Sequence, residues 1–274
     1  MRTFPFRPCA LLLALAATLA PGLPAAEPVR VNGSGSALEM LKPLVAAYRK
    51  SHPQVEIHVG KPLGSSGAIK ALLAGALDLA VGSKPANPAE VAQGAIFRDY
   101  GQTPLALISG GATGQTGLTS EALAGIYAGA TTAWPNGAKI RLVLRPEGDI
   151  DTRILQGLSP RMQAAMAEAL KKPGMIVAVT DPEANDVVAR TPGALGASGL
   201  CGLLGDPRPM VVLALNGVMP SVKTLAAGTY PLAKDIRFVT TARTSPEALQ
   251  FMAFIYSPAG RRLAEKAGVW VQAR

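Results

Sequence analysis

The sequence predicts an α/β protein whose sheet is mostly parallel and flanked by helices. Two observations support this fold class. Short β-branched runs alternate with stretches of helical apolar spacing, and Gly- and Ser-rich turns join strands to the helices that follow them. These turns bear on function, because ligands of such sheets bind at the carboxyl ends of strands, where helix N-termini present unpaired N–H groups.

The first 26 residues are predicted to form a cleavable signal peptide outside the fold. Arg2 and Arg7 give a basic start, ALLLALAATLA is an apolar run of secretory length, and PGLPAA ends in small residues that suit a signal peptidase. The apolar run is too short for a permanent membrane anchor. We therefore expect an exported, periplasmic protein that begins near Ala26 or Glu27, with Cys201 as its only cysteine and no intramolecular disulfide.

The first half of the mature chain is predicted to repeat a unit of strand, turn and helix. Strands are expected at 29–31, 55–59, 78–82 and 103–109. A helix is predicted after the NGSGS turn from apolar residues that recur at helical spacing. These residues are Leu38, Leu41, Leu44, Val45 and Tyr48. A second helix is expected at AIKALLAG, and the Gly/Thr-rich GGATGQTG is predicted to be a surface loop.

The second half continues the alternation. Strands are expected at KIRLVLR, MVVLAL and IRFVTT, and a helix is expected at TSEALAGIYAG. Another helix begins within GDIDT, and SPRMQAAMAEALKK follows it with Ser159 as the predicted N-cap and Pro160 as the first helical residue. Two final helices each open with Ser-Pro, in SPEALQFMAFIY and SPAGRRLAEKAG.

Composition argues against nucleic acid as a partner. The formal charge of +9 falls to +7 without Arg2 and Arg7, but the Lys and Arg residues are scattered and only 5% of residues are aromatic. The basic balance is interpreted as a general attraction for anions.

The sequence contains no GxSxG, Walker A or HExxH motif, and neither His52 nor His58 is placed for a catalytic triad or a zinc site. Cys201 has no evident His partner and is expected to be a small core residue. We therefore expect a protein without catalytic residues, cofactor or metal. A hydrolase that binds a divalent metal through the acidic residues near Asp149 stays open as an alternative.

Three Gly/Ser turns are candidates for an oxyanion site. GSGS at 33–36, GSSG at 64–67 and RPEGDIDT at 145–152 each precede a predicted helix, and the third begins with an arginine at a strand end. Glycine allows close backbone approach, hydroxyls donate hydrogen bonds and the helix dipole favours negative charge. A single turn of this kind before a helix is more often a simple helix cap. Three of them in one chain favour an anion site.

Several segments, in their order and spacing, are typical of one family. They are GSGSALEMLKPLVAAYRK, GSSGAIKALLAGALDLAVGS, GLTSEALAGIYAGATTAWPN, GALGASGL, YPLAKDIRFV and FMAFIYSPAGRRLAEKAGVWV. In these segments, which span nearly all of the mature chain, the sequence resembles the periplasmic phosphate-binding proteins of bacterial Pst-type ABC transporters. That family has the type II periplasmic-binding-protein fold.

The resemblance implies two α/β lobes that hold a solute between them and close on it. Lobe 1 is expected to comprise residues 27–106 plus 236–274, and lobe 2 residues 107–235. Such a protein acts as a monomer, delivers phosphate or a related oxyanion to a membrane ABC permease and catalyses nothing. A sensor role and an altered specificity, for a neutral or cationic solute, stay open as alternatives.

The resemblance also implies which residues contact the ligand. In the first turn these are Ser36, Ala37 and the N–H of Leu38, with Ala37 standing where phosphate binders usually offer a hydroxyl. Ser65 matches the serine donor of the second turn, and Arg145 matches the arginine of the third.

Two regions depart from the family pattern. Ser83 stands where the family commonly has an aspartate that accepts a proton from monobasic phosphate. In the third turn, Glu147 is expected to orient the arginine, Ile150 replaces a glycine, and Asp149 and Asp151 replace a serine and a threonine that donate to the anion. If both aspartates face the cleft, each repels an anion about 4 Å away by roughly 4 kcal/mol at an effective dielectric near 20. Alternatively, Asp149 caps its own helix.

Overall fold

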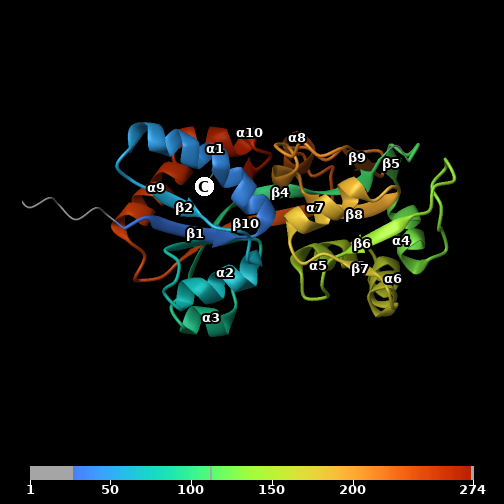
Figure 1. The fold of residues 1–274 in the computed structure, drawn as a ribbon, viewed down its shortest axis with the longest axis horizontal. Helices are drawn as coiled ribbons and strands as arrows, with labels where there is room; N and C mark the ends of the chain where they lie inside the picture. Colours follow the sequence, from blue (N-terminus) through green and yellow to red (C-terminus); the bar gives the residue numbers. More distant parts are fainter. Residues whose placement is uncertain (1–26, 112, 273–274) are drawn as a thin grey trace, which may run out of the picture.

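The structure is a computed structural model that describes residues 27–111 and 113–272, so the predicted signal peptide lies outside the described residues. Two lobes lie side by side and are joined by two long strands (Figure 1). Among the described residues, none of the helices has the length and apolar character that crossing a membrane requires.

The sheet of the first lobe is built around its first strand. Strand β1 (Val29–Gly33) pairs in parallel with β2 (Ile57–Val59) on one side and with β3 (Leu79–Gly82) on the other. Every residue of β3 is buried, because helices cover both faces of the sheet at this point. The short strand β11 (Trp270–Val271) completes the lobe near the C-terminus.

Helices cover both faces of this sheet. One face carries α1 (Gly35–Ser51), α9 (Pro246–Tyr256) and α10 (Pro258–Lys266), and the other carries α2 (Gly64–Leu73) and α3 (Pro88–Ala92) (Figure 1). The five apolar residues that predicted α1 are all buried, so its apolar stripe faces the core as expected. The C-terminal helices therefore pack with the first part of the chain.

The second lobe repeats this layered arrangement. Its strands are β5 (Gly117–Leu118), β6 (Arg141–Leu144), β7 (Ile176–Val177), β8 (Ala194–Gly199) and β9 (Met210–Leu215). Strand β6 pairs in parallel with both β7 and β8. Strand β6 is therefore an inner strand of the sheet. The turn that follows it faces the first lobe.

Each α-helix of the second lobe begins directly after a residue whose side chain accepts a backbone hydrogen bond. These helices are α4 (Ser120–Ala128), α5 (Ile150–Gln156), α6 (Pro160–Lys171), α7 (Asp181–Arg190) and α8 (Val222–Ala226). The 3-10 turn η1 (Leu200–Gly202) follows β8 and packs against α1 of the first lobe. Ser159 caps α6 by accepting a hydrogen bond from the Met162 N–H at 3.1 Å, and Pro160 is the first helical residue.

Two strands cross between the lobes. The first part of β4 (Ile96–Gly110) pairs with β10 (Ala233–Thr240), and its second part pairs with β8 and β9. Both crossing strands run antiparallel to neighbours, whereas the strands around β1 and β6 pair in parallel. Strand β10 matters for the site because it carries a buried lysine between the lobes.

The sequence did not predict α7 or β8, which lie between the predicted α6 and β9. Cys201 is buried in the core of the first lobe, as expected for a small core residue, and burial raises the pKa of its thiol to about 11. Its Sγ donates a hydrogen bond to the Ser36 carbonyl at 3.3 Å.

Candidate functional site

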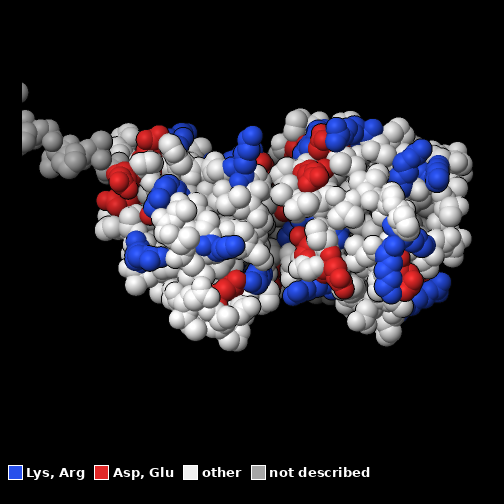
Figure 2. Space-filling view, turned by 60° about the horizontal axis from the view of Figure 1, so that its bottom comes forward, with Lys and Arg blue, Asp and Glu red and all other residues white. Residues whose placement is uncertain are grey.

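Four helix N-termini meet where the lobes face each other. The first turns of α2 and α5 line an open groove of about 700 Å³, and the first turns of α1 and α7 line a second cavity of about 310 Å³. Figure 2 shows a groove between the lobes with acidic and basic side chains beside it. Because helix N-termini expose unpaired N–H groups, the backbone alone makes this junction favourable for negative charge.

The open groove brings the second and third predicted turns together. Ser65 lines it from the first lobe, and Asp149 and Ile150 line it from the second. Ser83 lies directly behind Ser65, because its N–H donates to Ser65 Oγ at 3.0 Å. The Ser83 side chain is buried, and its Oγ has no hydrogen-bond partner among the described residues.

Arg145 is fixed at the end of β6, and only part of its guanidinium makes hydrogen bonds to the described residues. Nη2 donates to Asp149 Oδ2 at 2.9 Å and to the Val179 carbonyl at 3.0 Å. The side chain is only 7% exposed, yet within the described part of the chain neither Nε nor Nη1 has a hydrogen-bond partner. Burial alone lowers the pKa of Arg145, but the surrounding carboxylates raise it above its ordinary value, so the group is charged.

Asp149 is the N-cap of α5 and also the partner of Arg145. Its Oδ1 accepts the Asp151 N–H at 2.9 Å, which confirms the alternative that Asp149 caps its own helix. The expectation that Glu147 orients the arginine is wrong. A hydrogen bond of 2.9 Å from the Asp149 N–H to the Pro146 carbonyl closes the turn. The closed turn places the Asp149 side chain next to Arg145 and leaves Glu147 exposed to solvent.

Asp151 faces a buried lysine instead of the open groove. Its carboxylate is fully buried, and Oδ1 lies 2.7 Å from Nζ of Lys234 on β10. Burial, opposed by Lys234 but aided by neighbouring carboxylates, raises the pKa of Asp151 to about 6. Of the two departures in this turn, one is therefore a helix cap and the other is half of a buried ion pair.

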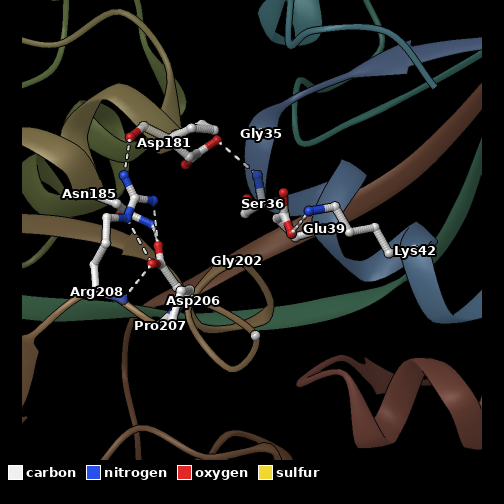
Figure 3. Close-up of a pocket in the computed structure, with 12 residues that line it drawn as sticks. Gly35, Ser36, Glu39, Lys42, Asp181, Asn185, Gly202, Asp206, Pro207 and Arg208 are labelled. Atoms are coloured by element: carbon white, nitrogen blue, oxygen red, sulfur yellow. Dashed lines mark hydrogen bonds and ion pairs between the residues drawn. The ribbon is translucent and has the colours of Figure 1, made fainter.

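The first residue of α7, Asp181, completes the cluster. Its Oδ1 accepts from Lys234 Nζ at 2.8 Å, and its Oδ2 accepts the Ser36 N–H at 3.2 Å. Figure 3 shows the Asp181 side chain directed at Ser36. Burial alone would raise the pKa of Asp181, but Lys234, Arg145 and the Ser36 N–H hold it below its ordinary value, so the carboxylate is ionised.

The first turn of α1 departs from the expected contacts. The Ser36 N–H is taken by Asp181, and Ser36 Oγ is buried without a hydrogen-bond partner among the described residues. The expectation that the Leu38 N–H faces the ligand is wrong, because this group makes the first helical bond, 3.0 Å to the Ser34 carbonyl. Ala37 and Leu38 belong to the core of the first lobe.

Sequence reasoning missed two residues of the cluster, Asp181 and Lys234. Thr180, Asp181, Pro182 and Glu183 form a helix start with a capping threonine, a proline and two acids, and this signal alone identifies the N-terminus of α7. Lys234 has no such signal, because a lysine at a predicted strand start normally faces solvent.

The described residues contain no group of three or more His, Cys, Asp or Glu that could hold a metal ion. The three aspartates of the cluster instead pair with Lys234 and Arg145.

Comparisons with known proteins agree with this architecture. The sequence profile of the family described as PBP superfamily domain matches residues 18–259. The phosphate-binding protein PstS of Borreliella burgdorferi is 23% identical over 247 residues, which cover 88% of each chain.

Two solved structures illustrate the match in three dimensions. A Clostridium perfringens protein with bound phosphate, described as a phosphate ABC transporter substrate-binding protein, is 19% identical with a TM-score of 0.76, covering 90% of this chain and 100% of its own. An ABC-type phosphate transport receptor of Vibrio cholerae is 22% identical with a TM-score of 0.60, covering 88% of this chain and 98% of its own. These similarities confirm the predicted two-lobed fold class.

Proposed function

Because the chain belongs to the PBP superfamily, we propose that it is an exported solute-binding protein that captures phosphate or a related oxyanion between its lobes. Its partner is then an ABC permease in the membrane, to which the captured solute passes when the lobes open. The relatives described as phosphate-binding proteins support the ligand class, and the similarity along nearly the whole chain supports the transport role.

Arg145 is the observation that carries the proposal. It lies at the end of β6, beside a groove lined by the first turns of α2 and α5, and Nε and Nη1 make no hydrogen bond to the described residues. A guanidinium binds an oxyanion through two parallel N–H groups, and helix N-termini add backbone donors. This combination suits a tetrahedral oxyanion held by charge-assisted hydrogen bonds.

In this proposal the protein acts as a periplasmic monomer and performs no catalysis. Binding and release need only a change in the distance between the lobes, and the two crossing strands allow the lobes to move while staying connected. Asp149 serves as a helix cap and Asp151 and Asp181 as ion-pair partners, and the proposal gives them no catalytic or metal-binding role.

Isothermal titration calorimetry of the purified protein tests the ligand class. Phosphate, arsenate and sulfate are titrated, with an amino acid and a polyamine as ligands of other charge. We expect saturable binding of phosphate or a related oxyanion, weakened at least tenfold by Arg145→Gln, since a charge-assisted hydrogen bond contributes about 1.5–3 kcal/mol.

Arg190→Gln is the matched control, because Arg190 is an exposed arginine of the same lobe whose ion-pair partner among the described residues is Asp186. Absence of binding for every oxyanion, or equal affinity in Arg145→Gln and the wild type, would refute the proposal. Saturable binding of the amino acid or the polyamine alone would refute it as well.

A further inference from the structure

A carboxylate of the protein itself lies where the donors of the site converge. Asp181 Oδ1 is 2.8 Å from Lys234 Nζ and 3.9 Å from Arg145 Nη1, and Oδ2 accepts the Ser36 N–H at 3.2 Å. These donors come from the crossing strand β10, from the second lobe and from the first lobe. An ammonium, a guanidinium and a helix N–H are the groups that an oxyanion between the lobes requires.

We propose that Asp181 is an internal anion that fills the oxyanion position and sets the solute affinity by competing for it. This inference rests on the proposed capture of an oxyanion. It gives Asp181 the role of a specificity-determining residue, although the side chain belongs to neither of the loops that line the open groove.

The local structure of α7 does not account for the position of this carboxylate. Thr180 is the N-cap of the helix, and its hydroxyl already accepts the Glu183 N–H. The Asp181 side chain turns away from its own helix and reaches the first turn of α1 in the other lobe (Figure 3). An aspartate that merely complemented the helix dipole would stay in solvent, whereas Asp181 is only 2% exposed.

Charge makes simultaneous occupation by Asp181 and an oxyanion unfavourable. Two cations, Arg145 and Lys234, already face three carboxylates, those of Asp149, Asp151 and Asp181. A second anion about 4 Å from the Asp181 carboxylate meets a strong repulsion inside a buried site. The solute therefore gains the full set of donors only when the Asp181 carboxylate leaves them.

Separation of the two lobes removes the Asp181 carboxylate from the Ser36 N–H. Gly35 of α1 touches the start of α7 so closely that a Cβ at this position would lie 2.2 Å from Pro182 Cδ. Because Asp181 and Ser36 belong to different lobes, opening the lobes separates them and frees the Ser36 N–H. Closing the lobes without solute restores the internal contact. Asp181 thus stabilises the solute-free closed form and raises the solute concentration needed for half-saturation.

Two variants of Asp181 test the inference by calorimetry with inorganic phosphate, arsenate and sulfate. Asp181→Ala removes both the charge and the volume of the side chain, and Asp181→Asn removes the charge with little change in shape. We expect Asp181→Ala to bind the oxyanion at least tenfold more tightly than the wild type, about 1.4 kcal/mol, with Asp181→Asn between the two.

Two control variants and a second measurement, with formate, accompany this test. They allow a conclusion even if Asp181→Ala folds poorly. Asp186→Ala and Asp186→Asn change a half-exposed aspartate on the same helix and should leave the affinity unchanged. Formate stands in for the missing carboxylate. It should raise the thermal midpoint of Asp181→Ala, which has the free donors, more than that of the wild type.

The outcomes separate this inference from the proposed function. If the wild type binds an oxyanion and neither Asp181 variant binds it more tightly, competition by Asp181 is refuted while oxyanion capture stands. If only the Asp181 variants bind, competition is supported and capture by the natural protein is refuted. If no form of the protein binds any oxyanion, both are refuted.

Discussion

Lys234→Met tests how far the buried cluster depends on a single cation. Nζ of Lys234 lies 2.7 Å from Asp151 Oδ1 and 2.8 Å from Asp181 Oδ1, and the three side chains are between 0% and 3% exposed. Each contact corresponds to about 6 kcal/mol of attraction at an effective dielectric of 20, most of which offsets the cost of burying the charges. Methionine keeps most of the length of the side chain and removes the ammonium, with its charge and its hydrogen bond to Asp181.

The expected loss follows from what the substitution leaves behind. Removing one partner of a buried ion pair costs about 3–5 kcal/mol, because the remaining charge stays uncompensated. At roughly 2–4 °C per kcal/mol for a chain of this size, the thermal midpoint at pH 7.5 should fall by roughly 6–20 °C. The deficit should shrink at pH 5, because Asp151, whose pKa is already about 6 in the wild type, then takes up a proton and needs no cation.

Thermal and urea unfolding of the purified protein at both pH values measure this loss. Lys223→Met is the control, since Lys223 is exposed on α8. A loss below about 1 kcal/mol, equal to that of the control, would show that Lys234 does not neutralise the buried carboxylates. A deficit independent of pH would contradict the assignment of Asp151 as the group that titrates.

Two further predictions concern neighbouring residues. The folded-state pKa of Asp151, about 6, exceeds its ordinary 3.8, so protonation of this group stabilises the wild type fully below about pH 4, and the stabilisation is lost as the pH rises through about 6. Asp151→Asn should remove this pH dependence of the free energy of unfolding, which amounts to at most about 3 kcal/mol, and urea unfolding at pH 4.5 and 7 measures it. The same pH dependence in Asp151→Asn and the wild type would show that Asp151 is not the group responsible. Gly35→Ala should lower stability by about 1–3 kcal/mol in the same assay, because its Cβ meets Pro182. Gly148→Ala, with no atom within 4 Å of the added Cβ, is the control, and equal stability of both variants would refute the close contact.

The elements with strong local signals were predictable from the sequence. The apolar stripe of α1, the Ser-Pro starts of α6, α9 and α10, and the buried strand β3 all carry patterns that tertiary contacts reinforce. Helix α7 was missed because its buried face includes Asp181 and Asn185, so its apolar periodicity is weak. The N-cap signal at Thr180 indicates the start of this helix more clearly than its apolar spacing does.

The composition of the site was less predictable than its location. Ser65, Arg145 and Asp149 lie at the lobe junction, where the Gly/Ser turns were expected to meet. The ion pairs of Lys234 join residues far apart in sequence and depend on how β10 crosses between the lobes. No local sequence pattern predicts such a contact. Arg145 was therefore the cation that the sequence placed near the acidic residues of the third turn, and their pairing with Lys234 was not predicted.

The three carboxylates of the cluster differ in how easily a solute can displace them. Asp149 is held by the cap of α5, and Asp151 sits inside the first turn of that helix against Lys234, so neither moves without unwinding α5. The Asp181 contact with Ser36 instead spans the two lobes and breaks when they separate. Capture of an oxyanion should therefore be coupled to lobe opening through Asp181. A proton on Asp151 adds to this coupling, because it removes the excess negative charge that three carboxylates leave against two cations.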